Sequence, residues 1–192
     1  MDDISYRLGT AVLSAAALAL ALPASAGAAT TKAVPDPAGD VVHTPIEGFT
    51  DLGPPAWADL LQATFTVSKG DHLEVTLQYA DLPETAGPGG MWGVDGTVTL
   101  PNGRNRSFNA WLIGTGEKYA GVGSKSCRVT TSISPPTNTV VLRINFGPCV
   151  GGDAKVRLRA KGTVKGSKTV GKTTYYEAVY TDDTPSKTLR LH

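Results

Sequence analysis

The sequence has few of the residues from which enzyme and metal sites are most often built. Its 192 residues include three histidines and two cysteines, and no HExxH, GxSxG, Walker A or CxxC motif occurs. These absences argue against zincin, serine-hydrolase, P-loop and thioredoxin-like chemistry. A small extracellular hydrolase with a carboxylate site stays open as an alternative, because two acids assemble in three dimensions and have no local motif.

Helical periodicity is absent as well. After residue 28, no window repeats its apolar residues at the 3.6-residue period of a helix. Glycine (22 residues) and proline (13 residues) are frequent, together with threonine, valine and serine. This composition is typical of strands and turns. The roughly 165 residues after residue 28 suit one domain, which would bury about 70% of its unfolded surface.

The N-terminus has no apolar run long enough to cross a membrane. The run from Ala11 to Leu22 is shorter than the roughly 20 residues that a spanning helix needs. It follows Arg7 and is followed by A-x-A boxes at residues 24–26 and 26–28, a pattern typical of a secretory signal peptide. We therefore expect residues 1–28 to be removed and the mature chain to be secreted and extracellular, without a transmembrane anchor.

Two segments alternate apolar and polar residues with the period of a half-buried strand. They cover residues 59–68 and 72–80, and the tetrad at residues 68–71 between them, Ser-Lys-Gly-Asp, is typical of a tight turn. They predict an antiparallel hairpin whose apolar face needs a second sheet to pack on. The positions expected on that face are Leu61, Ala63, Phe65, Val67, Leu73, Val75, Leu77 and Tyr79.

Further alternating segments follow, separated by glycine- or proline-rich turns. They predict an all-β domain, an antiparallel β-sandwich of the jelly-roll or immunoglobulin type with about eight or nine strands. We expect this domain to span residues 59–192, to be monomeric, and to pack with residues 29–58, an extended entry segment with loops. The predicted strands cover residues 92–100, 107–113, 127–133, 139–146, 155–161, 163–164 and 173–181.

The two cysteines, Cys127 and Cys149, would meet an oxidising compartment after export. A disulfide between them would stabilise the fold by about 3 kcal/mol through the lost entropy of the closed loop. The alternative is a catalytic thiol, which needs a nearby base. No histidine lies close to either cysteine in the sequence, so we expect one disulfide.

The order of several short motifs resembles known proteins. DPAGD at residues 36–40 precedes the hairpin, and the Cys pair, GPCVGGDAKVRLRA at 147–160 and YTDDTPS at 180–186 follow. This order resembles small secreted β-sandwich proteins of actinobacteria, most of them hypothetical exported proteins. DPAGD with an Asp-led first strand also resembles carbohydrate-binding domains of the DOMON and family-9 binding-module kind. The resemblance implies a non-catalytic sandwich.

Aspartates near the start of the mature chain form a candidate metal site. Asp36 and Asp40 flank a Pro-Ala-Gly turn, and Asp59 begins the first strand of the hairpin. Carboxylates beside a glycine turn supply the oxygen ligands that Ca²⁺ prefers, whereas the alternative is that they only cap turns. Asp182 and Asp183 would join them if the last strand paired beside the first.

Charge is distributed unevenly. Residues 34–97 hold ten acidic residues against one lysine, and residues 98–192 hold fifteen cations against five acidic residues. A basic stripe on the strand at 155–161 would attract a polyanion such as teichoic acid or an acidic glycan. The alternative is that these cations only keep a solvent-exposed or edge face soluble. No aromatic residues interleave with it, so we expect no specific nucleic-acid partner. The stripe consists of Lys155, Arg157, Arg159 and Lys161, continued by Lys165, Lys168 and Lys172.

Tryptophan is the remaining signal for a ligand. Trp92 falls with the apolar positions of its strand, Trp57 lies in a predicted loop, and Trp111 lies opposite the apolar face of its strand. An exposed indole suits sugar binding, although most tryptophans fill cores. Together these features predict a non-enzymatic binding or envelope-associated module for an extracellular glycan or polyanion. A secreted inhibitor that presents the loop at 84–90 is a further alternative.

Overall fold

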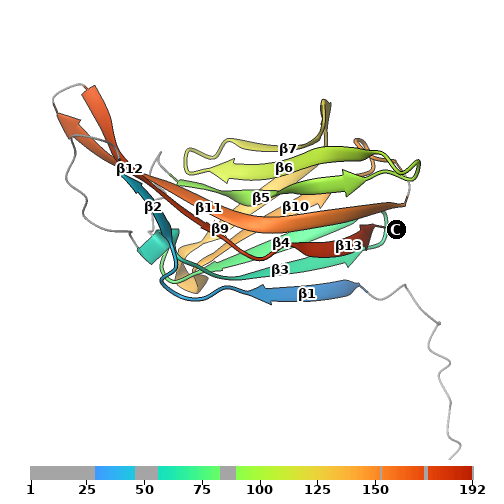
Figure 1. Ribbon diagram of the computed structural model, residues 1–192, viewed down its shortest axis with the longest axis horizontal. Coiled ribbons are helices and arrows are strands. Elements are labelled where there is room, and N and C mark those ends of the chain that lie inside the picture. Colours follow the sequence, from blue (N-terminus) through green and yellow to red (C-terminus); the bar gives the residue numbers. More distant parts are fainter. Residues whose placement is uncertain (1–28, 46–55, 83–89, 152, 171–172, 192) are drawn as a thin grey trace, which may run out of the picture.

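The computed structural model describes most of the chain (Figure 1). The predicted signal peptide, residues 1–28, lies outside the described residues. Within the part that is described, no helix is long and apolar enough to span a membrane. The backbone is described for residues 29–45, 56–82, 90–151, 153–170 and 173–191, and the side chains for the same residues except 43, 45, 57 and 164–178.

The described residues form two antiparallel sheets that pack together, which confirms the predicted all-β sandwich. Two short 3-10 helices interrupt the strands, η1 (Ala56–Ala58) and η2 (Pro135–Thr137). Sheet A has the order β1 (Thr30–Pro35), β3 (Leu60–Ser68), β4 (His72–Tyr79), β10 (Thr139–Asn145), β9 (Arg128–Ser134). Sheet B has the order β2 (Val42–Pro45), β12 (Thr173–Asp183), β11 (Ala154–Val170), β5 (Gly90–Thr99), β6 (Asn105–Ile113), β7 (Lys118–Val122), β8 (Lys125–Ser126), with β13 (Lys187–Leu191) also beside β11.

The core lies between the two sheets, because alternate residues of each strand point inward. Contacts of β6 with β10, β7 with β9 and β13 with β3 join the layers. The rings of Phe108 and Phe146 meet across the gap with centroids 4.9 Å apart, and such a pair contributes about 1 kcal/mol beyond its burial. The largest fully buried side chains include Phe65, Tyr79, Trp92, Leu142, Phe146 and Leu158.

The predicted hairpin is confirmed, with one difference at its start. Strands β3 and β4 pair antiparallel, and Asp71 and Gly70 in their turn have positive φ. A register shift between Leu60 and Gln62 inserts an extra residue, so that Leu60 is buried and Leu61 is only half-buried. Assigning Leu61 to the core face was wrong, because a β-bulge shifts the alternation by one residue.

The described sheets contain more strands than the eight or nine predicted, because short edge segments also pair. Strands β1 and β2 come from the entry segment, which was expected to be extended with loops and was not counted among the strands; β1 pairs with β3 and β2 with β12. The segments at 155–161 and 163–164 belong to one strand, β11, whose 17 residues pair with β5, β12 and β13. Figure 1 shows the β11–β12 hairpin extending beyond the rest of the sandwich.

The two cysteines form the predicted disulfide. Cys127 lies between β8 and β9, and its N–H donates to Ala120 O at 2.8 Å. Cys149 lies in the turn after β10, where its N–H donates to Phe146 O at 3.0 Å. The bond therefore fixes this turn of sheet A against the end of sheet B.

Candidate functional site

The first candidate site is a group of three carboxylates, the carboxylate cluster, formed by Asp36, Asp40 and Asp182. Each places an oxygen within 4.8 Å of oxygens of the other two. Asp36 follows β1 directly, and Asp182 is the next-to-last residue of β12. Asp36 is 9% exposed and Asp182 is 3% exposed, whereas Asp40 is exposed. The cluster therefore opens to solvent on its Asp40 side.

Backbone hydrogen bonds hold the loop that carries Asp36 and Asp40. The Asp36 N–H donates to Leu61 O at 2.9 Å. Gly39 has a φ of 80°, a left-handed conformation that glycine adopts without strain. Its N–H donates to both carboxylate oxygens of Asp59, at 3.0 and 3.1 Å. Asp59 therefore fixes the shape of the loop.

Asp182 connects sheet B to sheet A. Its Oδ2 accepts a hydrogen bond from the N–H of Leu60 at 2.7 Å, in a buried setting. Leu60 directly precedes the β3 bulge, which lies between Leu60 and Gln62. A hydrogen bond to a carboxylate is about twice as strong as one between neutral groups. Asp182 thus ties β12 to the start of β3 and at the same time belongs to the cluster.

Burial and mutual repulsion raise the pKa of two of these carboxyl groups. The pKa of Asp36 is raised to about 7, first by burial and then by the charge of Asp182 and a hydrogen bond with it, with smaller contributions from Asp40 and Asp183. Burial also raises the pKa of Asp182, against the opposing effect of the Leu60 N–H. Near neutral pH the two buried carboxyls therefore share a proton for part of the time.

One oxygen in the carboxylate cluster has no hydrogen bond. Asp36 Oδ2 is buried and has no partner in the part of the chain that is described. An unsatisfied buried oxygen is costly unless a proton or a cation satisfies it. Ca²⁺ takes six to eight oxygen ligands, and the three carboxylates offer anionic oxygens for it. The cluster has the chemistry of a site that exchanges a proton for a hard cation.

The cluster differs from the predicted metal site in one member. The structure brings Asp36 and Asp40 together, uses Asp59 to hold the Gly39 N–H, and adds Asp182. Asp182 does not arrive by the pairing of the last strand beside the first predicted strand, since β3 pairs with β1 and β4, and β12 pairs with β2 and β11. It reaches Asp36 from the other sheet.

The second candidate site is the outer face of sheet B over β11, β5, β6 and β7. Alternation in β11 buries Val156, Leu158 and Ala160, so the cations between them point to the outside. The four residues of the predicted stripe whose side chains are described therefore lie on one face of the sheet. Lys165, Lys168 and Lys172 lie outside the described side chains. The members of this outer face are Asp95, Asn109, Trp111, Tyr119, Lys155, Arg157, Arg159 and Lys161.

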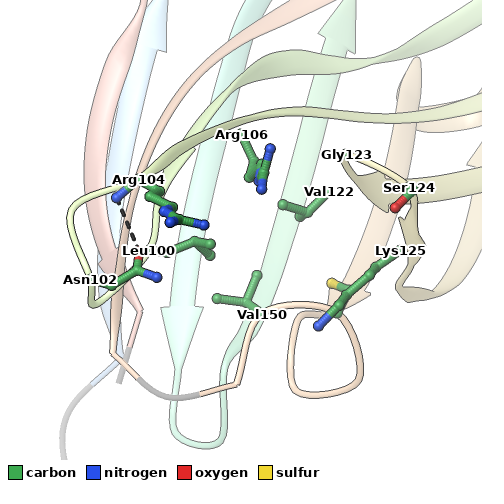
Figure 2. Close-up of a pocket in the computed structure, with 10 residues that line it drawn as sticks. Leu100, Asn102, Arg104, Arg106, Val122, Gly123, Ser124, Lys125 and Val150 are labelled. Carbon is green, nitrogen blue, oxygen red and sulfur yellow. Dashed lines mark hydrogen bonds between the residues drawn. The ribbon is translucent and has the colours of Figure 1, made fainter.

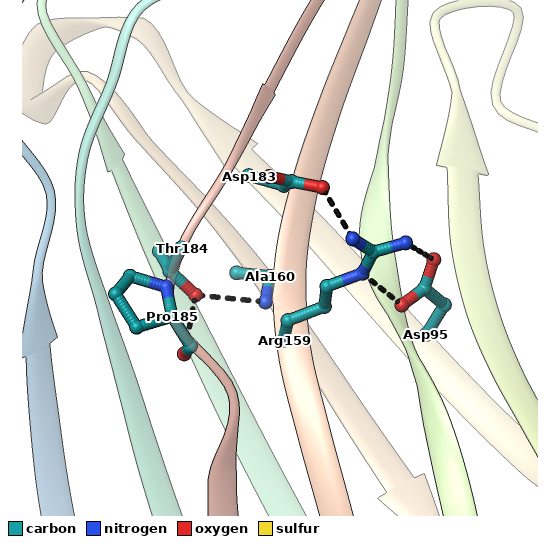
Figure 3. A network of polar contacts seen from close by, with 6 residues as sticks. All are labelled: Asp95, Arg159, Ala160, Asp183, Thr184 and Pro185. Carbon is teal, nitrogen blue, oxygen red and sulfur yellow. Dashed lines mark hydrogen bonds and ion pairs between the residues drawn. The ribbon is translucent and has the colours of Figure 1, made fainter. Parts of the chain in front are cut away.

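Arg159 is held by two acids, Asp95 of the outer face and Asp183 at the end of β12 (Figure 3). Its Nε and Nη2 donate to the two oxygens of Asp95 at 2.7 and 3.2 Å, and its Nη1 donates to Asp183 Oδ2 at 2.7 Å. The sheet register sets Asp95 opposite Arg159. The Ala160 N–H donates to Thr184 Oγ1 at 3.1 Å and fixes the chain that follows Asp183. Arg159 thus presents a fixed planar group, not a free charge.

Trp111 lies beside an aromatic neighbour and a glycine. Its ring stacks on Tyr119, with centroids 5.7 Å apart and planes 29° apart. On its other side the register partner is Gly93, where a Cβ would collide with the backbone oxygen of Ala110. A hollow of about 300 Å³ lies beside the indole. Its lining includes Met91, Gly93, Asp95, Asn109, Trp111 and Lys161.

The other tryptophans and the predicted loop contribute little to either site. Trp92 is fully buried, as its position in the alternation predicts. Trp57 lies in η1, and its side chain is outside the described part of the structure. Of the loop at 84–90, only Gly90 is described, at the start of β5.

No protein-family model matches the chain, and a search among curated proteins finds no match. A function therefore has to be inferred from the chemistry of these surfaces.

Proposed function

We propose that the protein is a secreted, non-enzymatic binding module that holds an acidic glycan on the outer face of sheet B. The observation that carries the proposal is the stacked Trp111–Tyr119 pair beside the Asp95–Arg159 ion pair. Ligand sites typically combine an apolar or aromatic surface with a few fixed polar groups that orient the ligand. A sugar ring packs on the indole, and its hydroxyls bond to Asp95, Asn109 and Arg159.

The cations beside this aromatic pair favour a glycan that carries anionic groups. Lys155, Arg157 and Lys161 have no ion pair within the described residues. They lie at alternate positions of β11, where successive side chains on one face are about 7 Å apart along the strand. The Cys127–Cys149 disulfide is compatible with an oxidising extracellular compartment and supports secretion.

In this proposal a cation has a structural part. Ca²⁺ in the carboxylate cluster would satisfy Asp36 Oδ2 and neutralise the repulsion with Asp182. It would thereby hold the loop after β1 against β12. Asp182 of the cluster is buried, whereas its neighbour Asp183 bonds to Arg159 on the outside of the sheet. The ion would therefore stabilise the end of β12 from its inner side.

One observation favours a second candidate, a hydrolase that uses carboxylates. A carboxyl with a pKa near 7 beside a second carboxyl is the kind of pair used in acid–base catalysis. However, Asp182 is almost fully buried and accepts the Leu60 N–H, which leaves little of the pair accessible to a substrate. Hydrolysis of glycosides, esters or peptides that is lost in Asp36→Asn would establish this second function.

Affinity electrophoresis tests the binding proposal. Native gels containing polygalacturonate, hyaluronate or teichoic acid should retard the wild-type protein, and gels containing dextran should not. Trp111→Ala should weaken binding roughly tenfold, the loss of one good contact. Lys155→Gln/Arg157→Gln should also weaken it, and the difference from wild type should shrink as salt is added.

A matched control separates the outer face from the protein as a whole. Val42→Ala removes an apolar side chain that is 64% exposed on β2 of the same sheet, and it should bind like the wild type. Retardation by these polymers that is equal in the wild type and Trp111→Ala would contradict the proposal, as would mobility unaffected by every acidic polymer.

A further inference from the structure

A pocket lined by cations lies where three turns meet at one end of the sandwich (Figure 2). The turns follow β5, β7 and β10. This is the end that carries the β3–β4 turn, since the Phe146 N–H donates to Asp71 O at 2.9 Å. We call it the basic pocket. Its lining residues include Leu100, Arg104, Arg106, Val122, Lys125 and Val150.

The alternation of β6 places two of these cations on the side of the sheet that faces the core. Phe108, Ala110 and Leu112 point inward from β6. Arg106, and Arg104 just before the strand, continue the same alternation and emerge where the core ends. Figure 2 shows both guanidinium groups directed over the apolar side chains of Leu100, Val122 and Val150. Charges at inward positions also protect sheet edges, but that role does not require cations from separate turns around one hollow.

The walls of the basic pocket are held in place before any ligand arrives. In the β5–β6 turn, Leu100 N–H donates to Arg104 O at 2.9 Å and Arg104 N–H donates to Asn102 Oδ1 at 3.1 Å. In the turn after β10, Val150 N–H donates to Phe146 O at 2.8 Å, next to the disulfide. A preorganised pocket loses less conformational entropy on binding.

The basic pocket has an uncompensated positive charge. None of its ten lining residues is acidic. Within the described residues, the ion pairs involve Arg143 and Arg159, and neither Arg104, Arg106 nor Lys125 takes part in one. Three cations around a concave, partly apolar surface focus a positive potential on the hollow. Two of them are guanidinium groups, whose planar donors match the oxygens of a phosphate.

From this geometry we propose that the basic pocket binds a phosphate monoester carried on a sugar-sized molecule. The hollow of about 300 Å³ is at the lower end of the range of small-molecule sites. A phosphate monoester carries a charge of about −1.5 to −2 at neutral pH, which suits three cations better than a single carboxylate does. The apolar wall of Leu100, Val122 and Val150 contacts the body that bears the phosphate.

This site is independent of the proposed glycan face. The even-numbered residues of β6 face inward, and Arg104 and Arg106 follow the same alternation. Trp111 is odd-numbered and points outward. Binding at the basic pocket should therefore be unchanged in Trp111→Ala. Loss of glycan binding on the outer face would leave this site intact, and the reverse also holds.

Isothermal titration calorimetry with glucose 6-phosphate on the full folded protein tests the site. We expect one site per chain and an affinity at least tenfold higher than for glucose 6-sulfate or glucuronate, with no binding of glucose. The affinity should fall as the pH drops through about 6, where the phosphate loses one charge while the arginines keep theirs. Arg104→Gln/Arg106→Gln should weaken binding at least tenfold.

Two further variants separate a built site from a general charge effect. Val150→Phe keeps every charge but fills the hollow, so it should also weaken binding. Lys32→Gln/Lys187→Gln removes the same charge from β1 and β13 and should leave the affinity unchanged. Urea unfolding of each variant establishes that it is folded under the titration conditions. The proposal is overturned by equal affinity in wild type and Arg104→Gln/Arg106→Gln, by equal losses in the two charge variants, or by no binding heat at millimolar glucose 6-phosphate.

Discussion

Replacing Asp36 by asparagine should stabilise the protein above neutral pH and leave its stability unchanged in acid. The asparagine side chain has nearly the shape of a protonated aspartate but cannot ionise. In the folded protein the pKa of Asp36 is raised from 3.8 to about 7, chiefly by burial and by Asp182. The groups that face it are Asp40, Asp182 and Asp183, all acidic, so no neighbour in that set offsets its charge.

The sign follows from proton linkage. Because the folded pKa lies above the unfolded one, the folded state holds an extra proton between about pH 4 and pH 7. The stabilisation that the raised pKa of Asp36 gives the folded state is fully present below pH 4 and is lost as the pH rises through 7. A difference of about 3 pKa units corresponds to about 4 kcal/mol. In a domain of this size that is a shift of roughly 8 to 16 °C in melting temperature.

Urea unfolding followed by tryptophan fluorescence, with EDTA present, measures the effect. Near pH 8, Asp36→Asn should exceed the wild type in unfolding free energy by up to about 4 kcal/mol, and near pH 4 the two should coincide. Millimolar Ca²⁺ near pH 8 should stabilise the wild type, by about 2.7 kcal/mol at a hundredfold excess over Kd. Asp36→Asn should lose most of this gain.

Asp81→Asn provides the control, because Asp81 is an exposed acid outside the carboxylate cluster. It should change neither the pH dependence nor the response to Ca²⁺. The reasoning would be refuted if Asp36→Asn were less stable than the wild type near pH 8 in EDTA, or if its effect were the same at both pH values.

Two other variants and one mass measurement have expected outcomes. Cys127→Ser/Cys149→Ser should lower the free energy of unfolding by about 3 kcal/mol, measured in urea, because it opens a loop with a sequence separation of 22; equal midpoints with and without reductant in the wild type would contradict this. Gly93→Ala should lower the melting temperature and weaken glycan binding, since its Cβ would meet backbone atoms of β6; a fully stable variant would show that the strands can separate. Intact mass of the protein from culture medium should correspond to a start near residue 27 or 29, and retention of residues 1–28 would contradict export.

The parts of the fold that depend on local alternation could be predicted from the sequence. Period-two patterns identified β3, β4, β5 and β10, and Trp92 was correctly placed in the core. The bulge between Leu60 and Gln62 could not be predicted, because the Leu60 N–H beside it bonds to Asp182, a partner 122 residues away in the chain. The short edge strands were missed for a related reason, since their few residues become strands only when an existing edge pairs with them.

The candidate sites also contain residues that local sequence could place and residues that depend on tertiary packing. Asp36 and Asp40 share a turn, so their proximity followed from spacing alone, whereas Asp182 depends on how the sheets pack. Alternation identified the outward cations, but not that Arg159 is bound to Asp95, because this requires the register of β11 against β5.

The basic pocket gave no local signal. It forms only when three turns meet at one end of the sandwich.

The bond from Asp182 to Leu60 and the position of β13 bear on when the chain can fold. Leu189 and Leu191 of β13 are buried in the core, and they are synthesised after nearly all of the described domain. Contacts over such separations form slowly, because the entropy of closing a long loop is lost before they form. A nascent chain therefore lacks β13 and the bond between Asp182 and Leu60 until nearly all of the described domain has been synthesised. That delay would suit the secretion proposed above, because a chain that is still unfolded can cross a membrane and fold on the far side.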